Sequence, residues 1–576
     1  MLILFSVLIK NNNFFFPYIV PRTVYFQIIT ACLLAIAVLF VGLYPVYRPK
    51  WTLIHSAIAV WFGTMALSTV FSADPSKSMF GTFERAFGFF EVLHYGVLLF
   101  VSTVALRTER QWNIFLAVNL AIGTYAAMNL LGSVLLTGYV PPTVAGNPTF
   151  ISAYLIFSIF FALYLFTQTH NRKLKILLGF IAFIQAAAVV LSNVRGAFLG
   201  LGAAAFFMII YAIWKYKNIR HLLVGGLVIV FLIYGLLFIN RGSPFLSNNS
   251  IVRRITNFSL QEETIKARFA MWRIALSGIK ERPLLGWGRE NYSLVFNTHF
   301  DPSFDAAGVG EAWEDRAHNV FIDELIHGGT VGLLAYLFLL TAIFISVRSK
   351  PLFIALLIAY TVQNLTGVDT LNSYLPFFIY IGLLDHKSWR LSEGVRPTYN
   401  PPGPKALAAM GLSLFVATTS IFFTIQSARG NVAVHDALSN LAVNDYTAFQ
   451  KDYDKGKRIL APFPYLEAEA VMLLSSVVNQ AAGSFAKLDN YKNYLNQIIS
   501  DLQRVTLRNE MEQRFLIMFA GLLLNNVPVD KSYLDRADVI IKKLITSSPN
   551  RKLYINFVLS SQRTRAALAA QANQPQ

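Results

Sequence analysis

Long apolar runs alternate with short polar intervals from the N-terminus to about residue 426, and the rest of the chain is mainly polar. A helix needs about 20 mostly apolar residues to cross the ~30 Å hydrocarbon core of a bilayer. The runs that approach this length predict an all-α membrane bundle of about 12 transmembrane helices. The predicted spans are residues 23–46, 52–72, 86–106, 113–137, 149–167, 174–192, 196–214, 221–240, 320–347, 351–367, 371–385 and 405–426.

The loops between these runs fall into two alternating sets. Short basic loops belong on the cytoplasmic side of a membrane, so we place there residues 47–50, 107–110, 171–175, 215–221, 348–350 and 386–390. The other set then faces outward: residues 72–84, 137–148, 193–195, 241–320 and 366–373. This alternation predicts a multi-pass protein of the cytoplasmic (inner) membrane whose long 241–320 loop faces outward.

Both ends of the chain differ from this pattern. Residues 1–22 are apolar in two short pieces, which predicts a partial span or a re-entrant segment before the 23–426 transmembrane domain. Residues 427–565 predict an extracytoplasmic domain of amphipathic helices, over 432–460, 464–482, 487–507, 509–525 and 531–547. That domain resembles tetratricopeptide helix pairs, although no 34-residue period is clean. Residues 566–576 are predicted to form a disordered tail.

Composition supports the membrane class and narrows the partners. Hydrophobic residues make up 55% of the chain and the mean hydropathy is +0.50, whereas soluble proteins usually lie below zero. The net charge of +18 comes largely from basic loops. No aromatic-interleaved basic patch or zinc spacing accompanies it, so nucleic acid is not an expected partner. The lone cysteine, Cys32, says nothing about the redox compartment.

The 241–320 loop contains an amphipathic helix with an arginine at its edge. From residue 262 to 280, apolar side chains recur every three or four positions at Ile265, Phe269, Trp272, Leu276 and Ile279. Such a helix can lie in the headgroup plane with Trp272 as its anchor. The planar guanidinium of Arg268 would then lie at headgroup depth, where its fork of donors suits a diphosphate.

Two further outward positions are candidates for chemistry. Arg195 stands in a tight turn between two spans, where the positive-inside rule disfavours arginine, so it is either a functional residue or a snorkelling helix end. His318 precedes Asn319, a predicted N-cap, with Asp323 and Glu324 in the first turns of the next span. His318 is either a plain cap-region residue or a general base.

Other polar positions are less specific. Glu84 and Arg85 lie at an outward boundary, where a structural ion pair and a substrate contact are equally compatible with the sequence. His299 and Asp301 could contact a metal, but no other ligand converges there. With no zinc spacing, Walker loop or dinucleotide fingerprint, we expect neither a metal nor a cofactor.

Together these residues suit transfer of a glycan from a lipid diphosphate. A diphosphate is already a good leaving group, so the pair of carboxylates that a glycosidase needs is not required. Arg195 and Arg268 could stabilise the departing diphosphate, and His318 could accept the proton of an acceptor hydroxyl.

The same residues lie in motifs that resemble the bacterial O-antigen ligase/polymerase family over residues 20–390. The motifs are Ser192 to Leu199, Arg268 to Trp272, Arg282 to Asn291 and Arg316 to Asn319, with Asp74 to Gly81, Glu84-Arg85 and Gly146 to Pro148 upstream. The resemblance implies an undecaprenyl-diphosphate-linked donor bound by Arg195 and Arg268, with Trp272, Glu84, Arg85 and Asn319 as further substrate contacts. It also implies acceptor activation by His318 without a metal, and lipopolysaccharide biosynthesis as the setting. Ala267 replaces the serine usual before the second arginine.

Several alternatives remain open at this point. Within the same class, the chain could be an O-antigen polymerase or a protein O-oligosaccharyltransferase, because the sequence does not define the acceptor as a lipid or a glycan. A transporter or flippase of lipid-linked glycans is an alternative of another class, although transporters place their sites near the midplane. A scaffold that binds a protein partner through its C-terminal helices is a third alternative.

Overall fold

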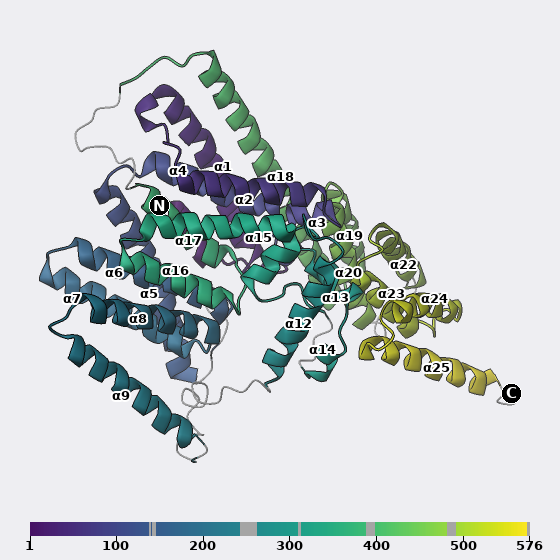
Figure 1. Cartoon of the computed structure of the whole chain (residues 1–576). Helices are drawn as coiled ribbons and strands as arrows, with labels where there is room; N and C mark the ends of the chain where they lie inside the picture. Colours follow the sequence, from purple (N-terminus) through teal and green to yellow (C-terminus); the bar gives the residue numbers. More distant parts are fainter. Residues whose placement is uncertain are drawn as a thin grey trace.

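The computed structural model describes residues 1–137, 140, 146–241, 243, 262–308, 313–386, 398–480 and 491–572, and every element in them is a helix. A bundle of long helices forms one part of the molecule, and the C-terminal helices pack against one end of it (Figure 1). Parts of the predicted 137–148, 241–320 and 386–390 loops, and the last residues of the predicted tail, lie outside the described residues.

Eight helices are long and apolar enough to cross a membrane: α1 (Val20–Leu43), α2 (Leu53–Val70), α5 (Glu109–Thr137), α6 (Pro148–Gln168), α7 (Arg172–Leu191), α8 (Arg195–Lys215), α15 (Val320–Val347) and α18 (Pro404–Ala442). The other predicted spans coincide with α4 (Phe89–Ala105), α9 (Arg220–Ile239), α16 (Pro351–Asn364) and α17 (Leu371–His386), and as spans they stay predictions. The multi-pass membrane class is therefore confirmed, but the count of about 12 is not. Before α1, a 3-10 helix over Leu2–Leu8 packs against α1, α5 and α17.

Loops predicted to share a side of the membrane contact one another. At one end of the bundle, Thr52 Oγ1 donates to Asp385 Oδ1 over 2.9 Å, and the Arg107 guanidinium binds the Tyr47 carbonyl. At the other end, Asn319 Nδ2 donates to the Leu365 carbonyl over 3.3 Å. These contacts join segments that the charge pattern places on the same side of the membrane.

Helix α15 is broken in the middle, and the Pro283–Gly288 turn fills the break. Gly329 has φ +65°, so the helical hydrogen bonds are interrupted there. The carbonyls of Ile326 and His327 instead accept from the amides of Trp287 and Gly288, at 2.8 and 3.1 Å. In return, the Thr330 and Val331 amides donate to the Pro283 and Leu284 carbonyls, at 2.8 and 3.2 Å. The turn therefore satisfies backbone groups that the break leaves without partners inside the helix.

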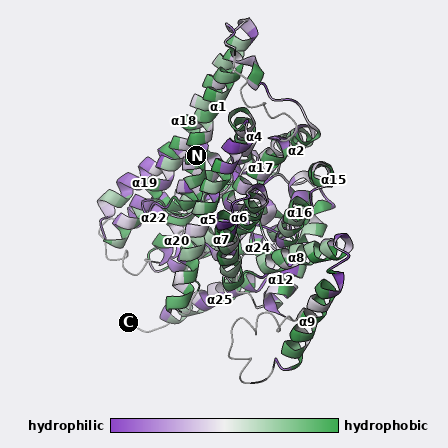
Figure 2. Cartoon of the chain, turned by 90° about the vertical axis from the view of Figure 1, so that its left-hand side faces the viewer, coloured by the Kyte–Doolittle hydropathy of each residue, from purple (hydrophilic) through white to green (hydrophobic). Residues whose placement is uncertain are grey.

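The C-terminal helices share one hydrophobic core with the end of α18. They are α19 (Tyr446–Leu460), α20 (Pro464–Gln480), α22 (Tyr491–Arg508), α23 (Gln513–Asn525), α24 (Ser532–Ser547) and α25 (Lys552–Ala572). Helices such as α19 and α22 carry more hydrophilic residues than bundle helices such as α9 (Figure 2). The tetratricopeptide-like organisation predicted for them is not confirmed.

Two predicted boundaries in this region differ from the structure. Helix α18 continues from the membrane segment to Ala442, so no linker lies at residue 427, and the predicted 432–460 helix is two helices separated at Asn444, which has φ +62°. Gly430 lets α18 approach Leu460 of α19 closely. Helix α25 extends to Ala572 through residues predicted as a disordered tail, because its alanine-rich end favours helix.

Candidate functional site

Arg195 occupies the first turn of α8, after a tight turn in which Asn193 has φ +66°. Its guanidinium makes a two-point ion pair with Glu262, including an Nη2–Oε1 distance of 2.8 Å, and its side chain is 37% exposed. The sequence did not reveal this partner. Because the pair is solvent-accessible, a ligand oxyanion could replace Glu262 at modest cost.

Arg268, on α12 (Glu263–Ile279), is half-buried, and within the described residues it donates no hydrogen bond and forms no ion pair. Burial lowers the pKa of its guanidinium, and the charge of Arg195 lowers it further, while Glu314 opposes both. The two predicted arginines are therefore near enough to repel each other. Such a place is favourable for an anion with two or more charges.

His318 adopts φ +53°, a left-handed conformation that a histidine rarely takes. The Ala317 amide donates to Asp323 Oδ1 over 2.8 Å, and Asn319 caps α15 by accepting from the amides of Phe321 and Ile322 at 3.0 and 3.3 Å. The predicted N-cap is therefore confirmed. These three hydrogen bonds hold the turn that presents the imidazole, and the His318 side chain is 30% exposed.

Charged groups from several elements face His318. Burial lowers the pKa of its imidazole; Asp323 and Asp315 raise it, and Arg268 and Arg85 lower it. Glu314 Oε2 lies 3.8 Å from His318 Nε2. The net effect favours the neutral imidazole, which is the form that can accept a proton. The charge of Arg195 acts on Arg268, and the charge of Arg268 acts on His318, so the three side chains lie in one region of the structure.

Arg85 forms an ion pair with Asp315, and a substrate contact of Glu84 or Arg85 stays a prediction. Nη2 of Arg85 lies 3.1 Å from Asp315 Oδ1, and Nε binds the other carboxylate oxygen. Burial would raise the pKa of Asp315, but Arg85 and then Arg316 reverse this and lower it. Glu84, by contrast, is exposed. Arg85 therefore does belong to an ion pair, although its partner is 230 residues away in the chain.

Trp272, predicted as a membrane anchor, connects α12 to the turn that carries His318. Its indole Nε1 donates to the Ala317 carbonyl over 2.9 Å, which ties α12 directly to the residue before His318. Of the apolar stripe predicted to face the membrane, only part is exposed in the structure: Phe269 and Leu276 are exposed. An unpredicted face of small and apolar residues is buried instead: Ala267, Ala270, Met271, Ile274, Ala275 and Gly278.

A buried polar layer behind His318 was not assigned from the sequence. Arg316 forms an ion pair with Glu290, and its Nη1 lies 3.3 Å from His327 Nε2. Arg289 donates to the Phe87 carbonyl over 3.0 Å. Arg289 and His327 line a small cavity with Thr64, Met65, Ser68 and Glu324. The motifs Arg282 to Asn291 and Arg316 to Asn319 contain Arg289, Glu290 and Arg316, and they were the sequence signals that could have pointed to this layer.

A second cavity of about 420 Å³, counted with its open mouth, lies beside Arg85. It is mainly apolar, and its walls come from the segment before α1 and from α1, α6 and α17; they include Tyr18, Arg22, Arg85, Phe87, Phe150 and Leu371. Arg22 also donates to the Ile9 carbonyl over 3.0 Å. The cavity therefore shares Arg85 with the surroundings of His318.

His299 and Asp301, the two positions considered for a metal, have other partners in the structure. Among the described residues, no group of three histidine, cysteine, aspartate or glutamate side chains could hold a metal ion. His299 instead lies 3.3 Å from Glu281, and Asp301 pairs with Arg273 at 2.8 Å.

Comparison with known proteins identifies the segment that carries the site. Residues 178–337 match the family model described as O-antigen ligase. The match extends from α7 into α15, so it contains Arg195, Arg268 and His318 together with the turn that fills the α15 break. No curated protein matches the chain.

Proposed function

We propose that this chain, an O-antigen ligase-family membrane protein, transfers a glycan from a lipid-diphosphate-linked donor to an acceptor hydroxyl at the membrane surface. The convergence of Arg195, Arg268 and His318 at one end of the bundle carries the proposal. Within a membrane glycosyltransferase of this kind, two arginines suit the diphosphate and a neutral histidine suits the acceptor hydroxyl.

In this mechanism the acceptor oxygen bonds to the anomeric carbon of the donor glycan. The bond between that carbon and the diphosphate oxygen breaks, and its electron pair leaves with the lipid diphosphate. His318 takes the hydroxyl proton. Arg268 stabilises the departing charge, and Arg195 exchanges Glu262 for a diphosphate oxygen. We assign undecaprenyl diphosphate as the donor lipid and the outer face of the inner membrane as the place of reaction.

The acceptor approaches from the cavity beside Arg85. Transfer needs two substrates that meet at one base, and both Arg268 and Arg85 act electrostatically on His318. The mainly apolar surface of the cavity suits a lipid-borne acceptor, and the paired Arg85 and Asp315 lie between the cavity and His318. Asn319 and Trp272, by contrast, are occupied in holding the His318 turn.

A reconstituted assay tests this function and its alternatives. The purified protein in detergent is incubated with a lipid-linked glycan and, separately, with lipid A-core, a peptide or no added acceptor. Glycosylated lipid A-core indicates a ligase, glycosylated peptide an oligosaccharyltransferase, and elongated lipid-linked glycan a polymerase. A transporter makes no product without two compartments, so absence of every product would refute transfer.

A further inference from the structure

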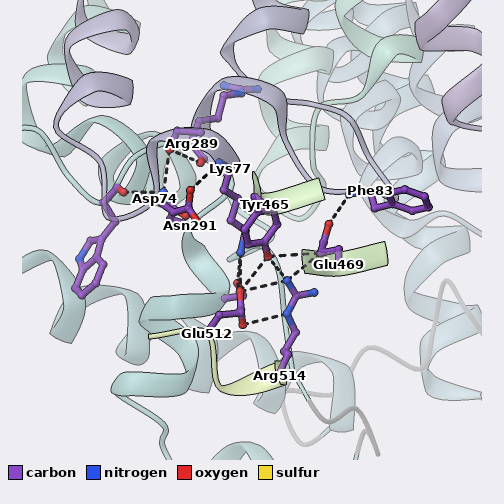
Figure 3. Close-up of polar contacts among 12 residues, drawn as sticks. Asp74, Lys77, Phe83, Arg289, Asn291, Tyr465, Glu469, Glu512 and Arg514 are labelled. Atoms are coloured by element: carbon purple, nitrogen blue, oxygen red, sulfur yellow. Dashed lines mark hydrogen bonds and ion pairs between the residues drawn. The ribbon is translucent and has the colours of Figure 1, made fainter. Parts of the chain in front are cut away.

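The C-terminal helices meet the loop after α2 through a buried ionic contact. Lys77, on the short helix α3 (Pro75–Phe80), places its Nζ 2.8 Å from Glu512 Oε2 and 2.7 Å from Ser293 Oγ (Figure 3). Its ammonium also lies 4.6 Å from the centre of the Tyr465 ring. The side chains of Lys77 and Glu512 are each 1% exposed. The contact therefore excludes water almost completely.

A second cation and carboxylate complete this docking cluster, which comprises Lys77, Tyr465, Glu469, Glu512 and Arg514. Arg514 contacts Glu512 and Glu469, at 3.0 Å each (Figure 3). Glu469 in turn accepts the Phe83 amide. Two buried cations face two buried carboxylates, so the charges balance only when the two parts are docked. Separation would leave unpaired charges, which is costly enough to fix one geometry.

From the docking cluster the chain leads directly to the candidate site. The Phe83 ring belongs to the C-terminal hydrophobic core, so the segment after α3 is anchored there as well. Arg85 follows two residues later and pairs with Asp315. Arg85 and Asp315 both act on His318. On the other side, Ser78 Oγ donates to the Arg289 carbonyl over 3.0 Å, so α3 is held from two directions.

We propose that Lys77, Glu512 and Arg514 are positioning residues for the transfer reaction. Through them the C-terminal helical domain holds the 77–88 segment, so that the Arg85–Asp315 pair stands beside His318. This inference rests on the proposed function. In this proposal the C-terminal helical domain is a fixed part of the site's surroundings. It does not act as a separate module that recruits a partner.

The chain offers a matched control for Lys77. Lys457 repeats its chemistry inside the C-terminal domain, with Nζ 2.5 Å from Asp501 Oδ2 and 4.9 Å from the centre of the Tyr453 ring. No residue of the 77–88 segment takes part in that contact. Lys77→Met and Lys457→Met therefore each remove a lysine–carboxylate pair beside a tyrosine ring, although Lys77 also binds Ser293 and Lys457 is 21% exposed; only Lys77→Met acts on the 77–88 segment.

We expect Lys77→Met to lower kcat at least ten-fold while the protein stays monodisperse in detergent, and Lys457→Met to stay within two-fold of wild type. The acidic limb of the pH–rate profile should also move to higher pH in Lys77→Met. The groups that face His318 are Asp323, Asp315, Glu314, Arg268 and Arg85. Displacing Arg85 removes a charge that lowers the pKa of His318, so the pKa rises. Unchanged kcat and profile in folded Lys77→Met would overturn the inference.

A second set of variants covers the case in which Lys77→Met does not fold. Glu512→Gln keeps the side-chain shape, and Arg85→Gln leaves the docking cluster whole while it removes the last link to His318. Arg85→Gln should shift the acidic limb upward by itself, and no shift would overturn the inference. In the double variant Lys77→Met/Arg85→Gln, kcat should fall by the same factor as in the single variant with the larger loss of kcat. Multiplicative losses would mean that the cluster does not act through Arg85.

Failure of this inference differs from failure of the proposed function. If wild type forms no product in any arm, the transfer reaction itself is wrong. If wild type is active and His318→Ala is not, but Lys77→Met has the wild-type kcat and profile, only the positioning role is wrong.

Discussion

The 77–88 segment connects two groups of charged residues, the docking cluster and the group around His318. The two groups differ in how their charges are paired. In the docking cluster, two cations meet two carboxylates and water is excluded. Around His318, Arg268 has no hydrogen-bond partner among the described residues, and Arg195 is 37% exposed beside a repelling neighbour. A cluster whose charges are already balanced has nothing to offer a ligand. The open group around His318 also contains the carboxylates of Glu262, Glu314, Asp315 and Asp323, but Arg268 donates no hydrogen bond among the described residues, so we propose that an anion binds there.

The largest expected effect is on turnover in the open group. His318→Ala should lower kcat by about 10²–10⁴-fold, the usual contribution of a general base, with little loss of stability because the imidazole is partly exposed. The glycan-transfer assay and thermal unfolding in detergent measure the two quantities. Near-normal turnover would remove His318 from the reaction.

Arg268→Ala should have the next largest effect on turnover. We expect turnover to fall by about 10²–10³-fold, as when one preorganised donor to a developing charge is removed. Arg268→Lys should recover only part of it, because an ammonium cannot form a two-point contact. Arg273→Ala is the matched control: it lies on the same helix and is 56% exposed in an ion pair with Asp301. Equal losses in the two alanine variants would indicate a general effect on α12.

Gly329→Ala tests the scaffold under the open group and should act on stability first. The added Cβ would lie 2.2 Å from the Leu284 carbonyl oxygen, and φ is +65°. We expect a loss of about 2–4 kcal/mol in the free energy of unfolding, which thermal unfolding would detect. Gly328→Ala is the control, since its Cβ would meet nothing within 4 Å. Equal stability of the two variants would contradict the proposed role of the turn in filling the break.

The smallest effect concerns pH. A base must be unprotonated, so activity should be present above the pKa of His318 and lost below it. Since burial lowers that pKa, the acidic limb should lie below the ordinary value of about 6.5. Asp315→Asn removes a charge that raises the pKa of His318 and should move the limb to still lower pH. A limb that does not move would place the titrating group elsewhere.

The membrane class and the site candidates could be predicted from the sequence because they depend on local patterns. Apolar length predicts a span wherever it occurs, and the N-cap role of Asn319 needs only the next three residues. The partners could not be predicted, since Arg85 meets Asp315 and Lys77 meets Glu512 across 230 and 435 residues. Nothing in the sequence around a carboxylate or an arginine indicates which residue of opposite charge will pair with it.

The break in α15 shows the same division within one element. The sequence contains both the Gly328-Gly329 pair and the Pro283–Gly288 turn, and each alone indicates only a weak point in a helix or a change of direction. Their four reciprocal backbone hydrogen bonds join them into one structure. Backbone amides and carbonyls are the same in every residue, so such a match cannot be recognised before the chain is folded.

By itself, the sequence determined that this protein is an all-helical membrane protein with an arginine- and histidine-bearing face, because hydrophobic length and the sidedness of charge are local properties. The tertiary structure alone decided that Arg195 shares a pair with Glu262, that Glu512 of the C-terminal helices pairs with Lys77 of α3, and that Arg268 stays without a hydrogen-bond partner among the described residues. The reason is physical: whether a charge is neutralised or left for a ligand depends on distances between residues far apart in the chain, and only folding sets those distances.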